Sequence, residues 1–420
     1  MSSRHKKDGV WYLVDRHRCN DLQVSHPTHR RGWLHSRCWW YVTSHIRGGI
    51  ITPLIYLSTS VAAPTSSEAV LCPDGVNFVT REACCKLFAI LDDIQENLFD
   101  GGKCNAEAHE ALRLTFSDAI AISKEAETGG GADGSIMLFS EVETAYAANV
   151  GLDEVVAIQK PFFERHDISA ADFIQFAGAV AVSNCPGAPR LPFFLGRVSG
   201  TEAAPDGLVP EAFHSANQIL SRFADAGPVG FSPTEVVRAL AAHSVGAADD
   251  VDIHAPQAAL DTTPFTFDTQ FFLETLLEGT TFPTDDSIGA EGEVHSAVKG
   301  VLRLESDQAL ARDPRMTCEW QSLVNNQSKM QAQFSDVWLK LSLLGQDVHL
   351  LTDCSDVIPI PQRITAHATF PPTLSKSDLQ QTCISSPFPT LETAPGPAIT
   401  IPPVPKNLAL RPAPPEQPPA

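Results

Sequence analysis

Arg113 and Ser117 are the first residues of the sequence whose types and spacing suggest chemistry. They lie four apart in the stretch ALRLTFSDAI, so on a helix both side chains project from one face, one turn apart. The arginine can stabilise developing negative charge, but a serine hydroxyl only exchanges hydrogen bonds and is no base near neutral pH. Asp118 follows at once. The spacing therefore singles out this face as a candidate site but does not say what chemistry it performs.

His243 is a second candidate, in the stretch SPTEVVRALAAHSVG, residues 232–246. Ser232 as N-cap, Pro233 in the first turn and Glu235 at the capping-box position predict a helix that ends at Gly246. An isolated histidine on such a helix fits either a satisfied core residue or a metal ligand. The helix alone does not decide between the two.

The elements that must position these residues are mainly helical. SAADFIQFAGAVAVSN from Ser169 and DTQFFLETLLEG from Asp268 predict further helices, and Gly, Pro and Asp dominate the segments between. The chain has 420 residues and is 43% hydrophobic, enough for one large or two ordinary domains. We predict a mainly α protein.

The charge of the body is strongly acidic. Residues 67–420 hold 21 Lys and Arg against 47 Asp and Glu. Such a balance argues against nucleic acid and anionic lipid as partners. The acidic surface either attracts cations or, as the simpler alternative, is merely solvated.

The two ends of the chain differ from the body. Residues 1–49 show no period of 2 or 3.6, so we assign no fold there and predict a disordered extension or a gene-model artefact. Residues 50–66 contain IITPLIYLSTSVAA, an apolar run of signal-peptide length that is too short to span a bilayer. Residues 386–420 form a proline-rich tail that cannot be helix or central strand. We expect a secreted, extracellular protein without a membrane anchor after signal removal.

Cysteine usage also favours secretion. Of ten cysteines, Cys19 and Cys38 fall in the extension and eight in the body. An even number without CxxC spacing predicts four disulfides in an oxidising compartment. The sequon at Asn326 predicts N-glycosylation, which fits the same compartment.

Several segments, in order and with matching spacing, carry a resemblance to one family. They are CPDGVNFVTREACCKLF, HEALRLTF and DAI on either side of residue 117, GGGADGSIM, DFIQFAGAVAVSNCPGAPRLPFFLGR, DTTPFTFDTQFF, ARDPRMTCEWQSLVNNQ, and LLGQD with LTDCSDVIP. Together they resemble the secreted fungal class II haem peroxidases, the group of lignin, manganese and versatile peroxidases. The resemblance implies a two-domain helical fold over residues 67–385, which holds haem between a distal half, 67–210, and a proximal half, 211–385.

On the proximal side the resemblance implies one haem b with His243 as iron ligand and Phe116 among the cofactor-binding residues. Asp307 in LESDQALARD resembles the family's buried carboxylate partner of the proximal histidine. A carboxylate that accepts the Nδ1 proton makes imidazole a stronger donor to iron. Asp307 therefore favours the ligand interpretation of His243.

On the distal side the family has a histidine where this chain has Ser117. In the family that histidine moves the proton of hydrogen peroxide, an asparagine that matches Asn149 holds its tautomer, and an arginine that matches Arg113 stabilises the leaving charge. Loss of one general acid–base group costs about 10²–10⁴-fold in rate. The resemblance thus implies a catalytic set of Arg113, Asn149 and Asp307 that Ser117 impairs.

Two calcium sites and four disulfides follow from the same resemblance. Ca²⁺ takes about six to eight hard oxygen ligands, and each implied site includes the residue directly after a haem-facing position. The implied ligands are Asp118, Gly131, Asp133 and Ser135 for the first ion, and Ser244, Asp261, Thr263, Thr266 and Asp268 for the second. The implied disulfides are Cys72–Cys85, Cys84–Cys354, Cys104–Cys185 and Cys318–Cys383.

The substrate-specific sites of the family are incomplete here. Manganese oxidation in the family uses two glutamates and an aspartate, and the matching positions are Ala106, Glu110 and Asp249, so manganese should bind weakly. The surface tryptophan of lignin and versatile peroxidases is replaced by Arg238, and packing is the expected role of Trp338.

We therefore expect a monomeric haem peroxidase that reduces hydrogen peroxide and oxidises small phenolic or lignin-derived aromatic compounds at the haem edge. Its turnover should be impaired by Ser117, and lignin degradation or an oxidative stress response is the expected setting. The alternative is a haem-binding pseudo-peroxidase with little turnover, whose distal face binds a small ligand or a partner. Steady-state turnover with peroxide and a phenol distinguishes the two.

The mature chain should begin between Ala62 and Val70. Cleavage there removes Cys19 and Cys38, which would otherwise enter an oxidising compartment as two unpaired thiols. N-terminal sequencing of the secreted protein measures the start directly. A secreted chain that starts before residue 50 would contradict the prediction.

Overall fold

The computed structural model describes residues 3–7, 10–14, 69–284, 289–407 and 409–410. The chain divides into two compact units, Met1–Thr65 and Ser66–Ala420. In the first unit, strands β1 (Ser3–Lys7) and β2 (Val10–Val14) pair antiparallel.

The β1–β2 pair lies within residues 1–49, for which the prediction of a disordered extension or a gene-model artefact stays a prediction. The second strand reads VWYLV, whose β-branched and aromatic residues favour extended structure even where no period is present. The remainder of the extension, the signal-like run at 50–63, Cys19 and Cys38 lie outside the described residues.

The second unit is mainly helical, as predicted. Its α-helices are α1 (Leu87–Asn97), α2 (Ala106–Ala119), α3 (Ser135–Leu138), α4 (Ser140–Glu143), α5 (Leu152–Glu164), α6 (Ala170–Ser183), α7 (Ala216–Asp225), α8 (Pro233–Ala239), α9 (Gln270–Glu274), α10 (Glu305–Arg312), α11 (Thr317–Leu323) and α12 (Gln327–Ser342). Short 3-10 helices add η1 (Glu82–Lys86), η2 (Ala147–Asn149), η3 (Leu240–Val245), η4 (Val348–Leu350) and η5 (Lys376–Asp378).

Strands in this unit are short and occur in antiparallel pairs. They are β3 (Val70–Leu71) with β4 (Phe78–Val79), β5 (Ile122–Ser123) with β6 (Thr128–Gly129), β7 (Phe194–Leu195) with β12 (Thr352–Asp353), β8 (Ala247–Ala248) with β9 (Ala258–Ala259), and β10 (Glu293–Val294) with β11 (Arg303–Leu304). Each pair holds only a short loop together, so the core is formed mainly by the helices.

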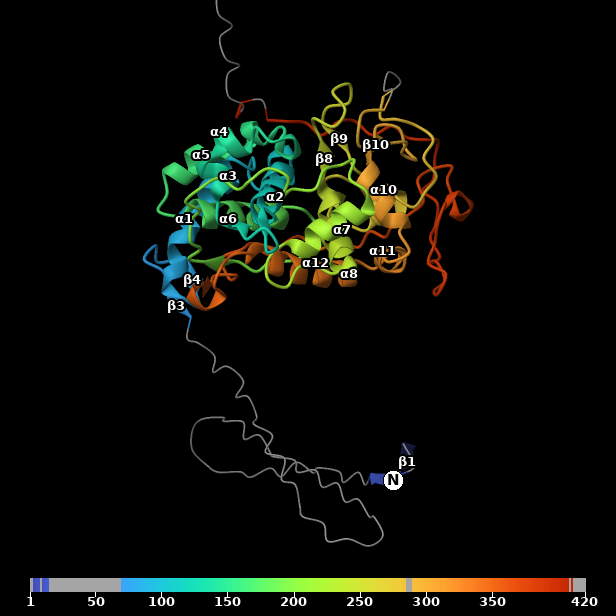
Figure 1. Ribbon diagram of the computed structural model, residues 1–420, viewed down its shortest axis with the longest axis horizontal. Helices are drawn as coiled ribbons and strands as arrows, with labels where there is room; N and C mark the ends of the chain where they lie inside the picture. The colour runs from blue at the N-terminus through green and yellow to red at the C-terminus, as the bar shows by residue number, and fades with distance from the viewer. Residues whose placement is uncertain (1–2, 8–9, 15–68, 285–288, 408, 411–420) are drawn as a thin grey trace, which may run out of the picture. The chain divides into compact units, whose positions relative to one another are not determined.

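Two groups of helices position the candidate site. Figure 1 shows α1–α6, in blue to green, on one side of the second unit and α7, α8, α10 and α11, in yellow-green to orange, on the other. Helix α6 is buried along its whole length and packs against α2, as expected of a helix that is apolar all round. Helix α12 packs against both α2 and α8 and thereby joins the two groups.

Local signals explain where the key helices begin. Asn105 caps α2 by accepting a hydrogen bond from the Ala108 N–H, and Ser169 caps the predicted helix α6 in the same way through Asp172. The capping box of Ser232 and Glu235 forms at α8 as predicted. That helix tightens into η3 at Leu240, so its last turns before Gly246 are 3-10 rather than α.

The helix expected from Asp268 is shorter than predicted. It begins at Gln270, because the Asp268 carboxylate accepts the Gln270 N–H, and it ends at Glu274. Beyond that residue Leu276 and Leu277 donate to carbonyls three positions back, which replaces the α pattern by turns.

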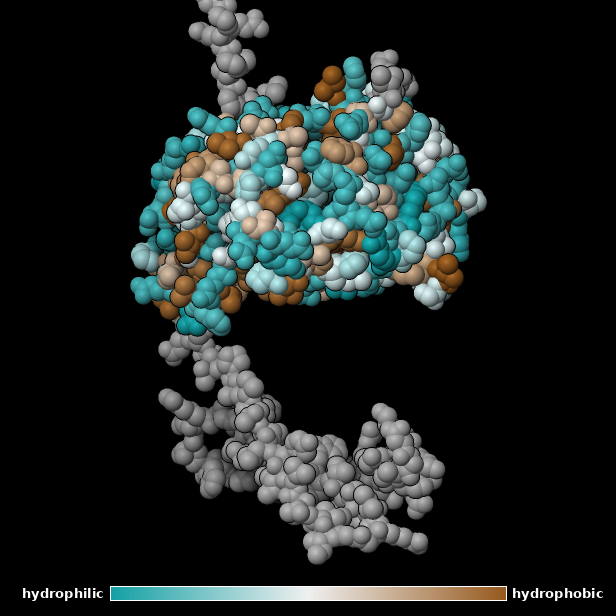
Figure 2. All heavy atoms as spheres, in the orientation of Figure 1, coloured by the Kyte–Doolittle hydropathy of each residue, from teal (hydrophilic) through white to brown (hydrophobic). Residues whose placement is uncertain are grey.

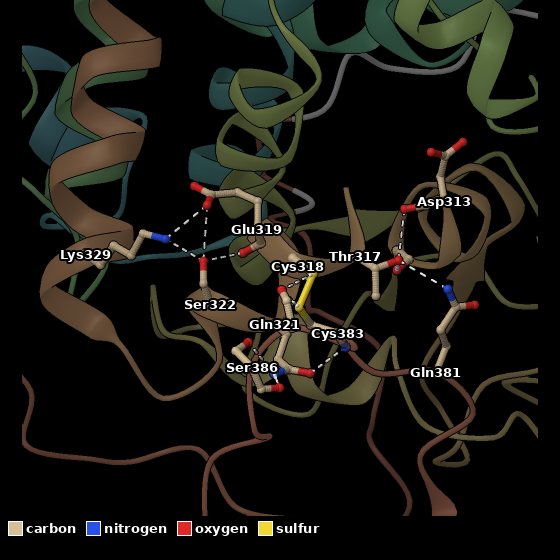
Figure 3. Close-up of a disulfide and its surroundings, with 12 residues drawn as sticks. Asp313, Thr317, Cys318, Glu319, Gln321, Ser322, Lys329, Gln381, Cys383 and Ser386 are labelled. Carbon is tan, nitrogen blue, oxygen red and sulfur yellow. Dashed lines mark hydrogen bonds and ion pairs between the residues drawn. A yellow bond between two sulfur atoms is a disulfide. The ribbon is translucent and has the colours of Figure 1, made fainter. Parts of the chain in front are cut away.

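Four disulfides join described residues of the second unit, and they link the same pairs that the resemblance implies: Cys72–Cys85, Cys84–Cys354, Cys104–Cys185 and Cys318–Cys383. Figure 3 shows the last of them, which ties α11 to the C-terminal segment. Gln321 reinforces that link, because its Oε1 accepts the Cys383 N–H at 2.8 Å and its Nε2 donates to the Ser386 carbonyl at 3.1 Å.

The C-terminal segment follows a defined track without forming a helix over 386–407. Ile401 donates its N–H to the Lys299 carbonyl, and Val404 donates to the Gln257 carbonyl, each at 2.9 Å. Gly300, with φ +85°, permits this approach, since a Cβ there would lie 2.0 Å from the Ile401 carbonyl oxygen.

The surface of the second unit is mixed. Figure 2 shows hydrophilic residues over much of the visible face, with hydrophobic residues in small groups among them. Among the described residues, no helix has the length and apolar character needed to cross a membrane.

Removing the Cys84–Cys354 disulfide should destabilise the protein more than removing Cys72–Cys85. The first closes a separation of 270 residues and the second one of 13. In the chain-entropy account the double alanine variants should lose about 6 and about 3 kcal/mol respectively. Denaturant unfolding of both variants measures the difference, and an equal loss would contradict the loop-length argument.

Candidate active site

The proximal side of the site is built from η3 and α10. His243 lies in η3, and its Nδ1 is 3.0 Å from Oδ2 and 3.1 Å from Oδ1 of Asp307, which is 1% exposed in the first turn of α10. Burial disfavours the charged imidazolium, but the charge of Asp307 and its hydrogen bond outweigh burial and raise the pKa of His243. With Nδ1 turned to Asp307, the Nε2 lone pair is the one left to bind a metal.

The distal side is built from α2 and the loop around η2. Arg113 donates through Nη2 to the carbonyls of Val150 at 2.9 Å and Ala148 at 3.4 Å, the two neighbours of Asn149. Burial is the main influence that lowers the pKa of Arg113, and the nearby carboxylates Asp250, Glu110 and Asp249 oppose it. The arginine is thereby held against the same loop as Asn149.

Asn149 carries a polar atom without a partner. Its Nδ2 donates to the Glu143 carbonyl at 2.9 Å, which fixes the orientation of the amide, while its Oδ1 is buried and unpaired. A buried acceptor without a donor costs about 1–3 kcal/mol. The structure therefore contains a fixed acceptor that needs a donor.

Ser117 and Phe116 complete the distal group on the last turns of α2. Ser117 is 2% exposed, and the ring of Phe116 lies 5.9 Å from that of Phe223 on α7. A buried hydroxyl offers one donor and an acceptor but no titration near neutral pH.

The first predicted calcium site gathers buried oxygens without partners. Oδ2 of Asp118 accepts the Gly134 N–H at 3.1 Å, while its Oδ1 and the Oγ of Ser135 are buried and unpaired. Burial and the charge of Asp133 raise the pKa of Asp118 well above its usual value. A Cβ at Gly130 would lie 1.6 Å from the Asp133 carboxylate, so the chain there closes on that group. The residues fit a hard cation.

The second predicted calcium site is built around Asp261, which is fully buried with Oδ2 unpaired. Thr263 Oγ1 bridges it to Asp268, at 3.3 Å from Asp261 Oδ1 and 3.1 Å from Asp268 Oδ1. Thr266 belongs to the same turn through its N–H to the Thr263 carbonyl at 2.9 Å. Ser244, directly after His243, is also fully buried, with its Oγ donating to the Ala241 carbonyl. Burial and neighbouring carboxylates raise the pKa of Asp261, which again favours a bound cation.

The residues that match the manganese site do not form a metal centre. Glu110 and Asp249 are brought together, but the ammonium of Lys406 lies between them, 3.9 Å from Glu110 and in contact with Asp249. Glu154 completes the contact at 3.1 Å. Four groups here therefore interact in a way that sequence spacing did not indicate.

The aromatic residues have the roles that packing predicts. Trp320 is fully buried and Trp338 is 3% exposed. Arg238, at the position of the family's surface tryptophan, donates from Nε to Glu319 at 2.9 Å. Asn326 is exposed and caps α12 through Lys329, so glycosylation at that position stays a prediction.

Two further carboxylates belong to the site, although no motif indicated them. Glu143 and Glu274 are buried, and burial raises the pKa of each to about 7. Glu143 also provides the carbonyl that holds Asn149, and Glu274 accepts from Thr262 beside Asp261. Only their burial, which a single sequence does not reveal, distinguishes them.

A histidine oriented by a buried carboxylate, together with an arginine-bearing helix in a mainly α fold, agrees with the class that the family comparison gives, the haem-dependent peroxidases, oxidoreductases that act on hydrogen peroxide. The chain belongs to the peroxidase family: residues 90–326 match the family described as Peroxidase, and residues 329–406 match the fungal peroxidase extension region.

Characterised relatives with different names are about equally similar. Ligninase C of Trametes versicolor is 54% identical over 82% of this chain and 94% of its own length. Versatile peroxidase VPS1 of Pleurotus eryngii is 55% identical over 81% and 92%, and manganese peroxidase 3 of Phlebia radiata is 51% identical over 83% and 96%. Overall identity therefore does not select a reductant, and the site residues must.

Without calcium, the protein should lose stability as the pH rises. Burial raises the pKa of Asp268 to about 6 and the pKa of Glu274 to about 7. In the unfolded chain the carboxyl pKa values are about 4, so the unfolded chain releases protons that the folded state still keeps. This stabilisation is fully present below about pH 4 and lost by about pH 7. Thermal unfolding in a chelator across this range measures it, with excess calcium as the control. A gap between the two Tm curves that narrows as pH rises would contradict the prediction.

Proposed function

We propose that this protein is an extracellular haem peroxidase that oxidises small phenolic or lignin-derived aromatic compounds at the haem edge, with a slow peroxide step. The observation that supports the proposal is the distal group: Arg113 is bonded to the loop that carries Asn149, the amide of Asn149 is fixed by Glu143, and residue 117 is a serine. The proposal includes one haem b bound through His243, two calcium ions and a monomeric chain.

Haem, when bound, would supply the redox chemistry of peroxide reduction. Asp307 holds the Nδ1 proton of His243 and so strengthens Nε2 as a ligand. Arg113 stabilises the negative charge that develops on the departing oxygen. Asp118 and Ser244 place one calcium ligand directly after each haem-facing residue, which keeps both helices in register.

Proton transfer is the step that this chain performs poorly. A general base must accept the first proton of peroxide and return it to the leaving oxygen, and Ser117 has no suitable pKa. The unpaired Oδ1 of Asn149 supports the interpretation that an imidazole is missing, because an imidazole N–H is the donor that such an acceptor would orient.

The class of reductant is inferred from the two other electron-transfer routes of the family, through bound manganese and through a surface tryptophan. Lys406 lies among the carboxylates that would bind manganese, and Arg238 replaces the surface tryptophan. Small aromatic compounds that reach the haem edge directly need neither route.

A pseudo-peroxidase is the second candidate, favoured by the same serine. In that case the buried Ser117 hydroxyl serves to bind a small ligand or a partner, and turnover with peroxide and a phenol stays near background. Steady-state assays of the haem-loaded protein separate the two functions.

Ser117→His should accelerate the peroxide-induced change of the haem spectrum by about 10²–10⁴-fold, since it restores the general base. Rapid mixing of the ferric protein with peroxide, at equal haem occupancy, measures the rate. The matched control is Ser117→His with Asn149→Ala, which should lose much of the gain because the imidazole is no longer oriented.

Equal rates for wild type and Ser117→His would defeat the lost-base interpretation. A wild type that already reacts as fast as an ordinary peroxidase would show that another group transfers the proton. Ser117→Ala should match wild type, because the hydroxyl has no part in that transfer.

A further inference from the structure

The C-terminal segment places a cation in a carboxylate cluster that no motif connects to it. Glu110 on α2, Glu154 on α5 and Asp249 after β8 form what we call the acidic trio. The Nζ of Lys406 lies 3.1 Å from Glu154, 3.9 Å from Glu110 and in direct contact with Asp249. Only 17% of the Lys406 side chain is exposed. The ammonium is thus enclosed by three carboxylates from separate elements.

The neighbours of Lys406 are also fixed. Val404 is 2% exposed and packs with Ala106 and Ala259 in a small apolar cluster. Asn407 donates its N–H to Oε1 of Glu107 at 2.9 Å. The position where the family has a glutamate is therefore covered by a valine of the tail, and the next carboxylate along α2 binds the tail backbone.

Backbone hydrogen bonds fix the segment that leads to Lys406. Residues 400–407 are held by Lys299 and Gln257 carbonyls, and Gly300 is the residue that lets Ile401 approach. Burial lowers the pKa of Lys406, but its contacts with Asp249 and Glu154 outweigh burial and raise it, so the side chain keeps its charge.

These residues do not fit manganese. A divalent cation needs converging hard oxygens, whereas one carboxylate is absent at Ala106 and an ammonium occupies the remaining ones. We propose that Lys406 is the resident cation of the acidic trio and that segment 400–407 excludes divalent cations from it. The inference goes beyond the proposed function, since it concerns cation binding and holds whether or not peroxide is turned over.

The test is a titration of haem-loaded protein with Mn²⁺, followed by calorimetry and by the loss of the free Mn²⁺ electron paramagnetic signal. Wild type should bind Mn²⁺ only weakly at the acidic trio. Lys406→Met should bind roughly tenfold tighter or more, because a positive charge next to the ion is removed. Lys406→Arg should behave as wild type, since it keeps the charge.

A second pair of variants tests the role of the tail. Ala106→Glu alone should not create a tight site, because Val404 and Lys406 still cover it, whereas Ala106→Glu with Lys406→Met should bind tighter than either single variant. Lys376→Met, at an exposed lysine of η5, is the charge-matched control and should leave affinity unchanged. Lys406→Gln repeats the charge removal if the methionine variant is poorly folded.

Tight binding of Mn²⁺ by wild type would overturn the proposal, as would equal affinity in wild type and both charge-removed variants. Neither outcome depends on peroxide turnover, so a failure here is distinct from a failure of the proposed function.

Discussion

Helix α2 is fixed at both of its ends, and the positions of Arg113 and Ser117 in the candidate site depend on it. At its start, Cys104 is joined to Cys185 and Asn105 caps the first turn. At its end, the Asp118 carboxylate accepts the Gly134 N–H. Arg113 and Ser117 lie between these anchors, so the helix sets where their side chains start, and the bonds of Arg113 to the Val150 and Ala148 carbonyls then hold the guanidinium. On the proximal side, too, a buried residue, Ser244, comes directly after the candidate ligand His243.

Features that depend on neighbours within one helical turn could be predicted from the sequence. The capping box of Ser232 and Glu235 and the cap of α6 at Ser169 formed as expected, because the signal and its structural effect lie three residues apart. The pairing of His243 with Asp307 spans 64 residues, and only the family resemblance could indicate it. The end of α9 at Glu274 was not predicted, since the sequence beyond it stays apolar while Leu276 and Leu277 donate to carbonyls three positions back.

The position of the C-terminal tail could not be predicted from a single sequence. Its prolines correctly indicate a segment without a helix, but they do not say where the segment lies. Asn407 meets Glu107 across 300 residues, and Lys406 reaches a cluster whose members come from three elements. Such contacts depend on tertiary placement, which neither periodicity nor local spacing records.

The unpaired oxygen of Asn149 also bears on the evolution of this chain. An unsatisfied buried acceptor lowers stability, so selection for stability alone would replace or satisfy it. Histidine and serine codons differ at more than one nucleotide, so a histidine at position 117 is not reachable from serine in a single mutation. If the distal residues act as we propose, the pocket is one amino acid away from a full set of catalytic groups, yet separated from it by intermediates that selection would have to tolerate.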